Sequence, residues 1–174
     1  SVHSKEISTL KETSWEPAAE FAQHSDWVRT VRFSADSRQL LSSSDDGTVR
    51  IWSLADEDFG QHQVVCRESD RIRSIAISSD DRLLAVGCDD CQVRLWDLQT
   101  RRLLETADTG RSRIGSVAFQ QQGQKLMLAA GGDRQTVMLW QVHTHLEPIQ
   151  ASQDSDADTS ETDAIEPLLG ATAR

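Results

Sequence analysis

Three evenly spaced tryptophans limit the folds that this chain can adopt. Trp52, Trp96 and Trp140 follow one another at intervals of 44 residues. Each ends an apolar run of similar sequence, and each run follows a turn that contains aspartate. A unit of about 40–45 residues with several short strands predicts a repeat architecture, in which each copy buries its apolar surface against the next.

Each copy is predicted to form four antiparallel strands, as in one blade of a β-propeller. In the first strand of each copy, large apolar residues alternate with mostly small ones, which suits a strand packed between two sheets. Arg32 is the exception in the small set. The predicted strands are Val28–Ser34, Gln39–Ser44, Thr48–Ser53, His62–Arg67, Ile72–Ser78, Leu83–Cys88, Gln92–Asp97, Leu103–Thr106, Ile114–Phe119, Lys125–Ala130, Thr136–Gln141 and a weak outer strand, Glu147–Ala151.

The segment before the first complete copy is interpreted as part of another blade. Lys5–Leu10 and Pro17–Ala22 align with outer strands of the later copies, so residues 1–23 would supply the outer half of a preceding blade. Residues 24–152 would form three blades. Closed propellers have about 4–8 blades, and an incomplete ring leaves apolar faces in water. We therefore expect a piece of a larger propeller, with the remaining blades as partners; self-association into a mixed ring is the less favoured alternative.

Negative charge is concentrated at the C-terminal end. The 174 residues include 28 Asp and Glu against 18 Lys and Arg, which gives a net charge of −10. Seven acidic residues and one arginine follow Trp140. Residues 153–174 are predicted to form a disordered acidic tail, because they have little to bury. This balance argues against nucleic acid and anionic membranes as partners, since both require a basic surface.

The chain has none of the segments that direct a protein to a membrane or out of the cell. No apolar run approaches the ~18 residues of a membrane span, and the first residues lack the apolar region of a signal peptide. Three cysteines are too few for a disulfide framework. These features predict an intracellular protein, cytoplasmic by default, with the nucleus left open.

The first copy carries the most informative motif. Its segments His24–Val28, Phe33–Ser37 and Leu40–Trp52 strongly resemble a WD repeat. In the second copy, Asp97 completes the signature Trp-Asp dipeptide, whereas Ser and Gln follow the tryptophan in the other two. The resemblance covers about residues 24–141 and implies an all-β WD-repeat propeller. It also implies a non-catalytic protein-interaction scaffold that binds peptides or protein domains through its loops and top surface.

In this family, a histidine, a strand hydroxyl, a turn aspartate and the tryptophan form a hydrogen-bonded network within a blade. In the first copy the resemblance assigns these roles to His24, Ser42, Asp46 and Trp52. Glu68 and Gly110 stand at the histidine position in the later copies, and Arg134 replaces the turn aspartate in the third. We therefore expect the second and third blades to depend more on apolar packing.

Family members contact their partners through two sets of positions. One set flanks the first apolar residue of the inner strand, which is the first strand of each copy, and the other immediately precedes the turn aspartate. Carried over by position, the partner-binding residues are Trp27, Arg29, Asp45, Arg71, Arg73, Asp89, Arg113 and Asp133. Four arginines would form a local basic surface, and Trp and Arg are enriched at interface hot spots. The expected partner is a protein or peptide with acidic or phosphorylated groups and an apolar anchor for Trp27. The alternative is that the arginines only pair with the aspartates.

The sequence predicts no active site, no metal site and no cofactor. Cys88 and Cys91 have C-x-x-C spacing, but a structural zinc site needs further ligands, and the repeat alignment places Cys91 in a hairpin turn. Gly131 and Gly132 stand at the end of a predicted strand, so they do not form a phosphate-binding loop at the start of a helix. The alternative to a scaffold is the propeller portion of a multidomain enzyme or signalling ATPase, with catalysis elsewhere in the parent chain.

Overall fold

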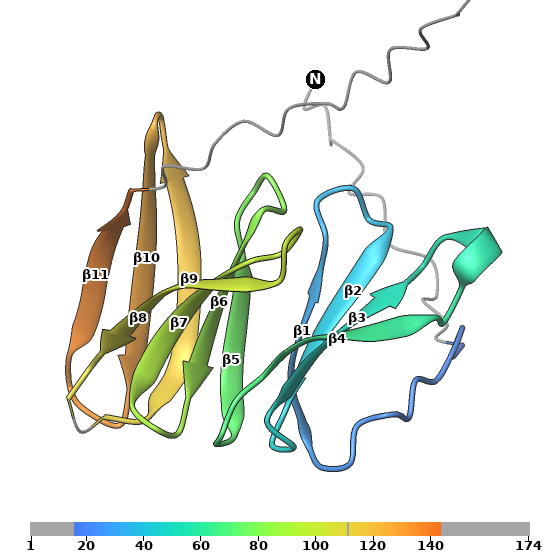
Figure 1. Cartoon of the computed structure of the whole chain (residues 1–174), viewed down its shortest axis with the longest axis horizontal. Helices are drawn as coiled ribbons and strands as arrows, with labels where there is room; N and C mark the ends of the chain where they lie inside the picture. The colour runs from blue at the N-terminus through green and yellow to red at the C-terminus, as the bar shows by residue number, and fades with distance from the viewer. Residues whose placement is uncertain (1–15, 111, 144–174) are drawn as a thin grey trace, which may run out of the picture. The chain divides into compact units, whose positions relative to one another are not determined.

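Apolar runs and aspartate-containing turns build three antiparallel sheets in succession. The computed structural model describes residues 16–110 and 112–143, which form eleven strands in two four-stranded sheets and one three-stranded sheet (Figure 1). Within these residues the only helical element is a 3-10 turn, η1 (Asp56–Asp58), and no helix is long and apolar enough to cross a membrane. The all-β prediction is therefore confirmed.

The first two sheets follow the predicted strand pattern closely. The chain order is also the order within each sheet: β1 (Val28–Phe33), β2 (Gln39–Ser44), β3 (Thr48–Ser53) and β4 (His62–Arg67), then β5 (Ile72–Ile77), β6 (Leu83–Cys88), β7 (Gln92–Asp97) and β8 (Arg102–Asp108). β1 and β5 end one residue earlier than predicted, because Ser34 and Ser78 belong to the turns. Their hydroxyls donate to Asp36 and Asp80, at 2.6 and 2.5 Å.

The third sheet has a longer hairpin than the sequence predicts. It contains β9 (Ile114–Gln122), β10 (Lys125–Gly132) and β11 (Val137–Val142), in the order β11–β10–β9. Gln122 pairs with Lys125, and Gln121 with Leu126. β9 therefore runs three residues beyond its predicted end at Phe119, and β10 runs two residues beyond its predicted end at Ala130.

The segment Pro17–Ala22 is not the predicted outer strand. It has no strand assignment within the described residues. Instead, the Phe21 ring stacks on Trp52, with 5.0 Å between ring centroids, and lies 5.8 Å from the ring of Phe59. This segment packs on the first sheet through an aromatic contact. The predicted strands Lys5–Leu10 and Glu147–Ala151 and the tail 153–174 lie outside the described residues.

Two apolar cores join the sheets, one on each face of the second sheet. The first core packs Leu41 and Val49 of the first sheet against Ile75 of β5. The second packs Ala76 and Ala85 of the second sheet against residues of the third, including Val117 and Leu128. Ile75 and Ala76 are consecutive, so their side chains point to opposite faces of the strand. The predicted alternation of large and small residues therefore serves two different cores.

Hydrogen bonds between inner strands add to this packing. Thr30 of β1 donates from Oγ1 to the carbonyl oxygen of Arg73 in β5, at 3.1 Å. The backbone amide of Val117 in β9 donates to the Ser74 hydroxyl of β5, also at 3.1 Å. These contacts hold the starts of β1, β5 and β9 side by side, and the candidate site lies there.

Candidate interaction surface

Strand bulges place two arginines at one end of the sheets, the lower end in Figure 1, where the inner strands begin. Each inner strand has a register shift just after its first residue: Val28 in β1, Ile72 in β5 and Ile114 in β9. A bulge turns its extra residue out of the regular alternation of the strand. The extra residues of β1 and β5 are Arg29 and Arg73.

Each bulge arginine forms an ion pair with the aspartate that directly follows the neighbouring strand, β2 or β6. Arg73 donates from Nε to Oδ1 and from Nη2 to Oδ2 of Asp89, both at 2.8 Å. Arg29 makes the same two bonds with Asp45, the bond from Nε measuring 2.7 Å. These bidentate contacts orient the guanidinium planes, and the hydrogen bonds from the arginines lower the pKa of both carboxyls.

The third pair is built differently. Arg113 donates from Nε to Oδ2 of Asp133 at 2.6 Å, but it precedes β9, and the extra residue of the bulge is Gly115. Gly115 has no side chain at the place where β1 and β5 carry arginine. A hollow of about 280 Å³ lies there, bordered by the second and third pairs. We call the three pairs, Arg29–Asp45, Arg73–Asp89 and Arg113–Asp133, the Arg–Asp row.

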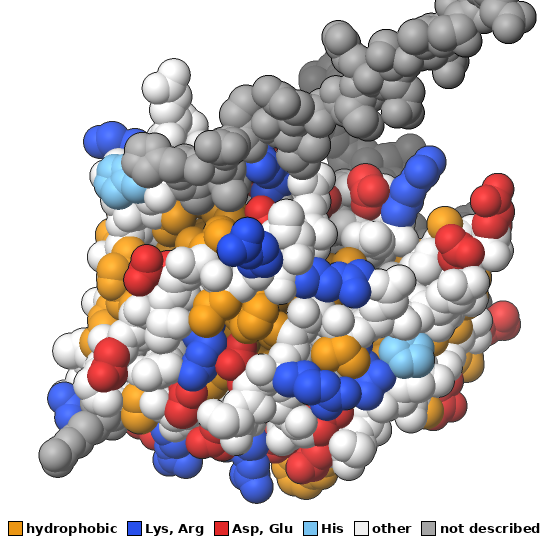
Figure 2. All heavy atoms as spheres, in the orientation of Figure 1, with side chains coloured by type: hydrophobic (Ala, Val, Ile, Leu, Met, Phe, Trp, Pro, Cys, Tyr) orange, Lys and Arg blue, Asp and Glu red, His pale blue; other side chains and the backbone are white. Residues whose placement is uncertain are grey.

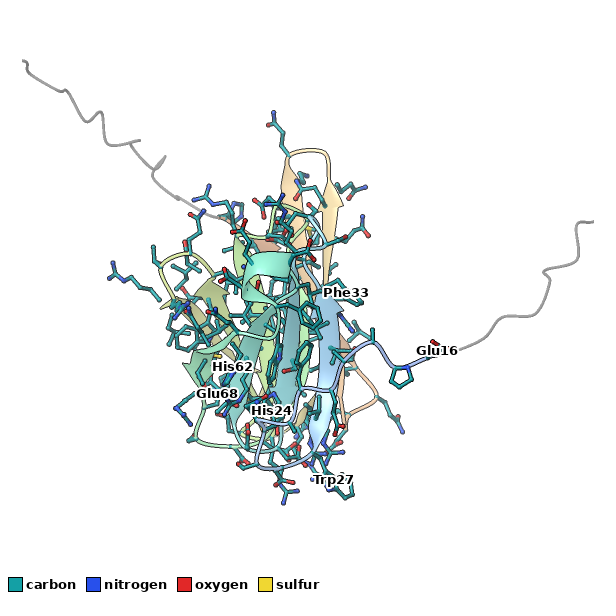
Figure 3. The ribbon with its side chains drawn as sticks, turned by 90° about the vertical axis from the view of Figure 1, so that its right-hand side faces the viewer. Glu16, His24, Trp27, Phe33, His62 and Glu68 are labelled. Atoms are coloured by element: carbon teal, nitrogen blue, oxygen red, sulfur yellow. The ribbon has the colours of Figure 1, made fainter. Side chains whose placement is uncertain are left out.

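Trp27 and Arg71 complete the set of eight residues predicted from the resemblance. Trp27 immediately precedes β1, is 70% exposed and projects from the lower end of the molecule in Figure 3. The guanidinium carbon of Arg29 lies 4.9 Å from the centroid of this ring, which is a cation–π distance. Arg71 immediately precedes β5 and is exposed. The structure brings all eight residues to one end of the sheets.

The expected basic surface is not what this arrangement produces. Each arginine of the row faces an aspartate, so the three pairs together carry no net charge, and Arg71 adds one positive charge. In Figure 2, basic and acidic side chains alternate along the lower edge of the molecule. The surface is therefore an array of oriented ion pairs.

Behind this surface, the structure brings together the four residues assigned to the first-sheet network. Trp52 donates from Nε1 to the Ser42 hydroxyl at 2.8 Å, and Ser42 lies 2.7 Å from Nε2 of His24. Nδ1 of His24 lies 2.8 Å from the carboxylate of Asp46. Because the ionised carboxylate of Asp46 can only accept, the proton of the neutral His24 ring is assigned to Nδ1. Nε2 is then unprotonated and accepts from the Ser42 hydroxyl. Consecutive hydrogen bonds therefore link the indole of Trp52 to the turn that contains Asp46.

Hydrogen bonds keep Asp46 ionised despite its burial. Burial alone would raise the pKa of this carboxyl, but hydrogen bonds from Thr48, from His24 and from the amide of Ser25 lower it well below its usual value. The Thr48 hydroxyl donates to Oδ1 at 2.6 Å and the Ser25 amide to Oδ2 at 3.1 Å. The carboxylate therefore fixes the turn between β2 and β3, next to Asp45 of the row.

The second sheet contains a polar network that the sequence did not lead us to expect. Glu68 accepts from Trp96 Nε1 at 3.2 Å and pairs with Arg94, whose Nε lies 3.1 Å from Oε2. Arg94 also donates to Asp90 at 2.5 Å and to the side chain of Gln92 at 2.6 Å. The expectation that this blade replaces the network by apolar packing is wrong, because an ion pair takes its place.

One residue explains the change of network. Val31 pairs with Ser42 in the first sheet, and Ile75 pairs with Val86 at the same place in the second. Val86 offers no hydroxyl to Trp96, so the partly buried indole N–H needs another acceptor. Glu68 supplies it. Burial raises the pKa of the Glu68 carboxyl, and the charge of Arg94 counteracts this effect.

Cys91 occupies a turn, and the thiols of Cys66 and Cys88 are buried. Cys91 has a φ of 69° and occupies the turn position that Gly47 occupies with a φ of 74° in the first sheet, as the alignment predicted. Burial raises the pKa of the Cys66 thiol to about 12 and that of Cys88 further still, so both stay protonated and unreactive. No cluster of His, Cys, Asp and Glu within residues 16–110 and 112–143 could hold a metal ion.

The model of the WD domain, G-beta repeat, matches residues 15–53 and 60–97. These ranges contain β1–β3 and β4–β7. These two stretches are WD repeats. The third sheet lies beyond the matched residues but keeps the same strand register, because Trp52, Trp96 and Trp140 pair with Leu40, Leu84 and Leu128.

Short stretches also match individual WD-repeat proteins. A stretch of 31 residues is 58% identical to the probable E3 ubiquitin ligase complex SCF subunit sconB of Talaromyces stipitatus, covering 18% of this chain and 5% of that protein. A stretch of 34 residues is 56% identical to apoptotic protease-activating factor 1 of Danio rerio, covering 20% and 3%. A stretch of 64 residues is 38% identical to the LST8 homolog of Drosophila melanogaster, covering 37% and 18%. The chain thus spans less than a fifth of each of these relatives.

Proposed function

We propose that this WD-repeat chain is a non-catalytic interaction module and that the Arg–Asp row, with Trp27 and Arg71 beside it, binds a protein or peptide partner. The observation that carries the proposal is the array itself. Three adjacent sheets present arginines at one end, held by aspartates, and an exposed tryptophan stands beside the first pair. Oriented arginines and an exposed aromatic ring are the residue types that dominate interface energetics.

The paired arginines keep donors for a partner. Arg29 and Arg73 each use Nε and Nη2 for their aspartates, and Arg113 uses Nε. Because a guanidinium carries five N–H donors, the remaining ones can bind a carboxylate or phosphate without breaking the pair. The partner that fits best is therefore acidic or phosphorylated and places an apolar group on Trp27.

We further infer that residues 24–152 are three blades of a larger propeller in an intracellular protein. The two outermost sheet faces of the described residues are apolar and exposed, with Val31 and Phe33 on β1 and Val137 and Leu139 on β11. Stacking with further blades would bury both faces, as the second sheet does on its two sides. The remaining blades are thus the second class of partner.

An alternative role follows from the named relatives. One stretch matches a subunit of an E3 ubiquitin ligase complex and another matches a protease-activating factor, so the propeller of this chain can also be the regulatory portion of a larger enzyme or signalling protein. Catalysis would then lie elsewhere in the parent chain. The full coding sequence of the parent discriminates the two, because a catalytic domain in it supports the regulatory role.

Binding of a model ligand tests the surface. We would titrate the chain into a fluorescein-labelled peptide that contains phosphoserine, several glutamates and one leucine, at low ionic strength, where screening is weakest. Arg71→Glu with Arg73→Glu should weaken binding by at least about tenfold. Arg102→Glu, an exposed charge reversal on β8, is the matched control and should change little. Equal affinity of all three proteins, with folding verified by circular dichroism, would rule the surface out.

A further inference from the structure

A second hollow lies between the first and second sheets, at the end opposite the Arg–Asp row. Its volume is about 490 Å³, within the ~300–1,000 Å³ range of ligand pockets. We call it the inter-sheet groove. Its floor is aliphatic and is formed by Leu41, Ile51, Ile77 and Leu98. In Figure 2, hydrophobic side chains lie next to basic ones on the face where these two sheets meet.

Two contacts between the sheets border this groove. The backbone amide of Ala35, in the turn after β1, donates to both carboxylate oxygens of Asp81, at 3.0 and 2.8 Å. Arg101, in the turn before β8, donates from Nη2 to the side-chain oxygen of Gln63 in β4. Each contact joins one sheet to the other at the edge of the groove.

Acidic residues outnumber arginines by one among the residues that line the groove. Asp58, Asp80 and Asp81 line it, against Arg82 and Arg101. None of the three aspartates takes part in an ion pair within the described part of the chain. The two residues before Asp58 in η1 are also acidic and exposed. A basic side chain would therefore find uncompensated carboxylates at the rim.

Four glutamine side chains line the groove: Gln39, Gln61, Gln63 and Gln99. Their amides carry both donors and acceptors, which are the groups that bind the carbonyl and N–H groups of an extended backbone.

We propose that the inter-sheet groove binds an extended peptide of a partner protein. An aliphatic side chain of this peptide rests on the floor, and a lysine or arginine lies against Asp58 and Asp80. The backbone of the peptide forms hydrogen bonds with the glutamine side chains that line the groove. The groove is separate from the Arg–Asp row and takes a basic rather than an acidic ligand, so each site can fail without the other.

Designed peptides test the groove directly. The probes are fluorescent heptapeptides of Ser and Gly with one Arg and one Leu, separated by one, two or three positions, titrated with the full chain. We expect at least one spacing to bind saturably, and replacing its Leu by Ser or its Arg by Glu should weaken binding at least about tenfold. Gln99→Trp, which fills the groove, and Asp58→Lys should weaken it similarly. Glu105→Lys, on exposed β8, is the matched control and should bind as the unaltered chain does.

Nuclear magnetic resonance locates the bound peptide. The side-chain amide signals of the four groove glutamines should shift on titration, while the indole signal of Trp27 should not. The proposal is overturned if no probe saturates below about 1 mM. It is also overturned if Gln99→Trp and Asp58→Lys bind as well as the unaltered chain, or if the shifts map to Trp27 instead of the groove.

Discussion

In the first sheet the indole N–H of Trp52 is linked to the turn aspartate through Ser42 and His24, whereas in the second sheet Trp96 donates directly to the carboxylate of Glu68. The network of the first sheet contains a single carboxylate, which four hydrogen-bond donors stabilise. The second places Glu68 and a second carboxylate around one guanidinium, that of Arg94. Two blades of one chain therefore solve the same hydrogen-bonding problem with different chemistry.

In both sheets the tryptophan N–H has a hydrogen-bond acceptor, although a different residue supplies it in each. The acceptor differs because one position of the second strand differs between the sheets. This position is Ser42 in β2 and Val86 in β6. The physical consequences also differ. Removing Arg94 leaves two carboxylates without their shared counter-charge, whereas removing His24 leaves a carboxylate that keeps its other donors. The following predictions test this difference, from the largest expected effect to the smallest.

Removing the cation of the second sheet should have the largest effect. Arg94→Met leaves Glu68 and Asp90 next to each other without their shared counter-charge, in a site where their side chains are largely buried. We expect a loss of about 3 kcal/mol in the free energy of unfolding, since breaking a buried pair leaves uncompensated charge. Urea denaturation followed by circular dichroism measures it. A loss below about 1 kcal/mol would show that the ion pair does not stabilise this sheet.

Removing the histidine of the first sheet should cost less. His24→Ala leaves Ser42 and Asp46 with one partner fewer each, but Asp46 keeps its bonds from Thr48 and Ser25. We expect a loss of about 2 kcal/mol by the same assay, since buried polar groups then lack a partner. If His24→Ala destabilises more than Arg94→Met does, the comparison is reversed.

The two carboxyls should give opposite pH dependences. The folded pKa of Asp46 is lowered, so its stabilisation is complete above the unfolded value of about 4 and is lost as pH falls below it. The folded pKa of Glu68 is raised, so its contribution favours folding below about pH 4.3 and declines as pH rises toward the folded pKa. Asp46→Asn should flatten the loss of stability in acid, and Glu68→Gln should remove an opposing slope. Unfolding titrations at pH 3–7 check both signs, and identical slopes for the two variants would contradict them.

The smallest effect should come from an arginine at the same strand position in the first sheet. Arg50 stands two residues before Trp52, as Arg94 stands two before Trp96. It forms no ion pair within the described residues, and its Nε is buried without a partner. Arg50→Met should therefore change stability by less than about 1 kcal/mol. A large loss would mean that the arginine position itself, rather than the ion pair with Glu68, stabilises each blade.

The sequence predicted the strands well because their boundaries depend on local chemistry. Serine and aspartate turns and alternating apolar residues place nearly every end of β1–β7 within one residue. The position of Pro17–Ala22 rested on spacing alone, and the prediction failed because Phe21 stacks on Trp52 instead. Spacing without a turn or an apolar pattern says little about strand pairing.

The sequence did not predict the contacts that the eight candidate residues make. The resemblance pointed to all eight positions, but it did not show that their backbone settings differ. Arg29 is the extra residue of its bulge, whereas Arg113 stands two residues before the extra residue of the third bulge, Gly115. The role of Arg94 also escaped prediction, because its partner Glu68 lies in a different strand connection. An acidic residue at the histidine position, together with an arginine two residues before the tryptophan, is the signal that could have revealed it.

The most direct test of the Arg–Asp row is the affinity of the phosphoserine peptide for the double variant Arg73→Asp, Asp89→Arg. This exchange keeps the ion pair and the net charge but moves the guanidinium from the bulge of β5 to the turn after β6. If the row binds acidic partners through its oriented arginines, the affinity should fall at least about tenfold while the free energy of unfolding stays nearly unchanged. An unchanged affinity in this folded variant would contradict the proposed surface.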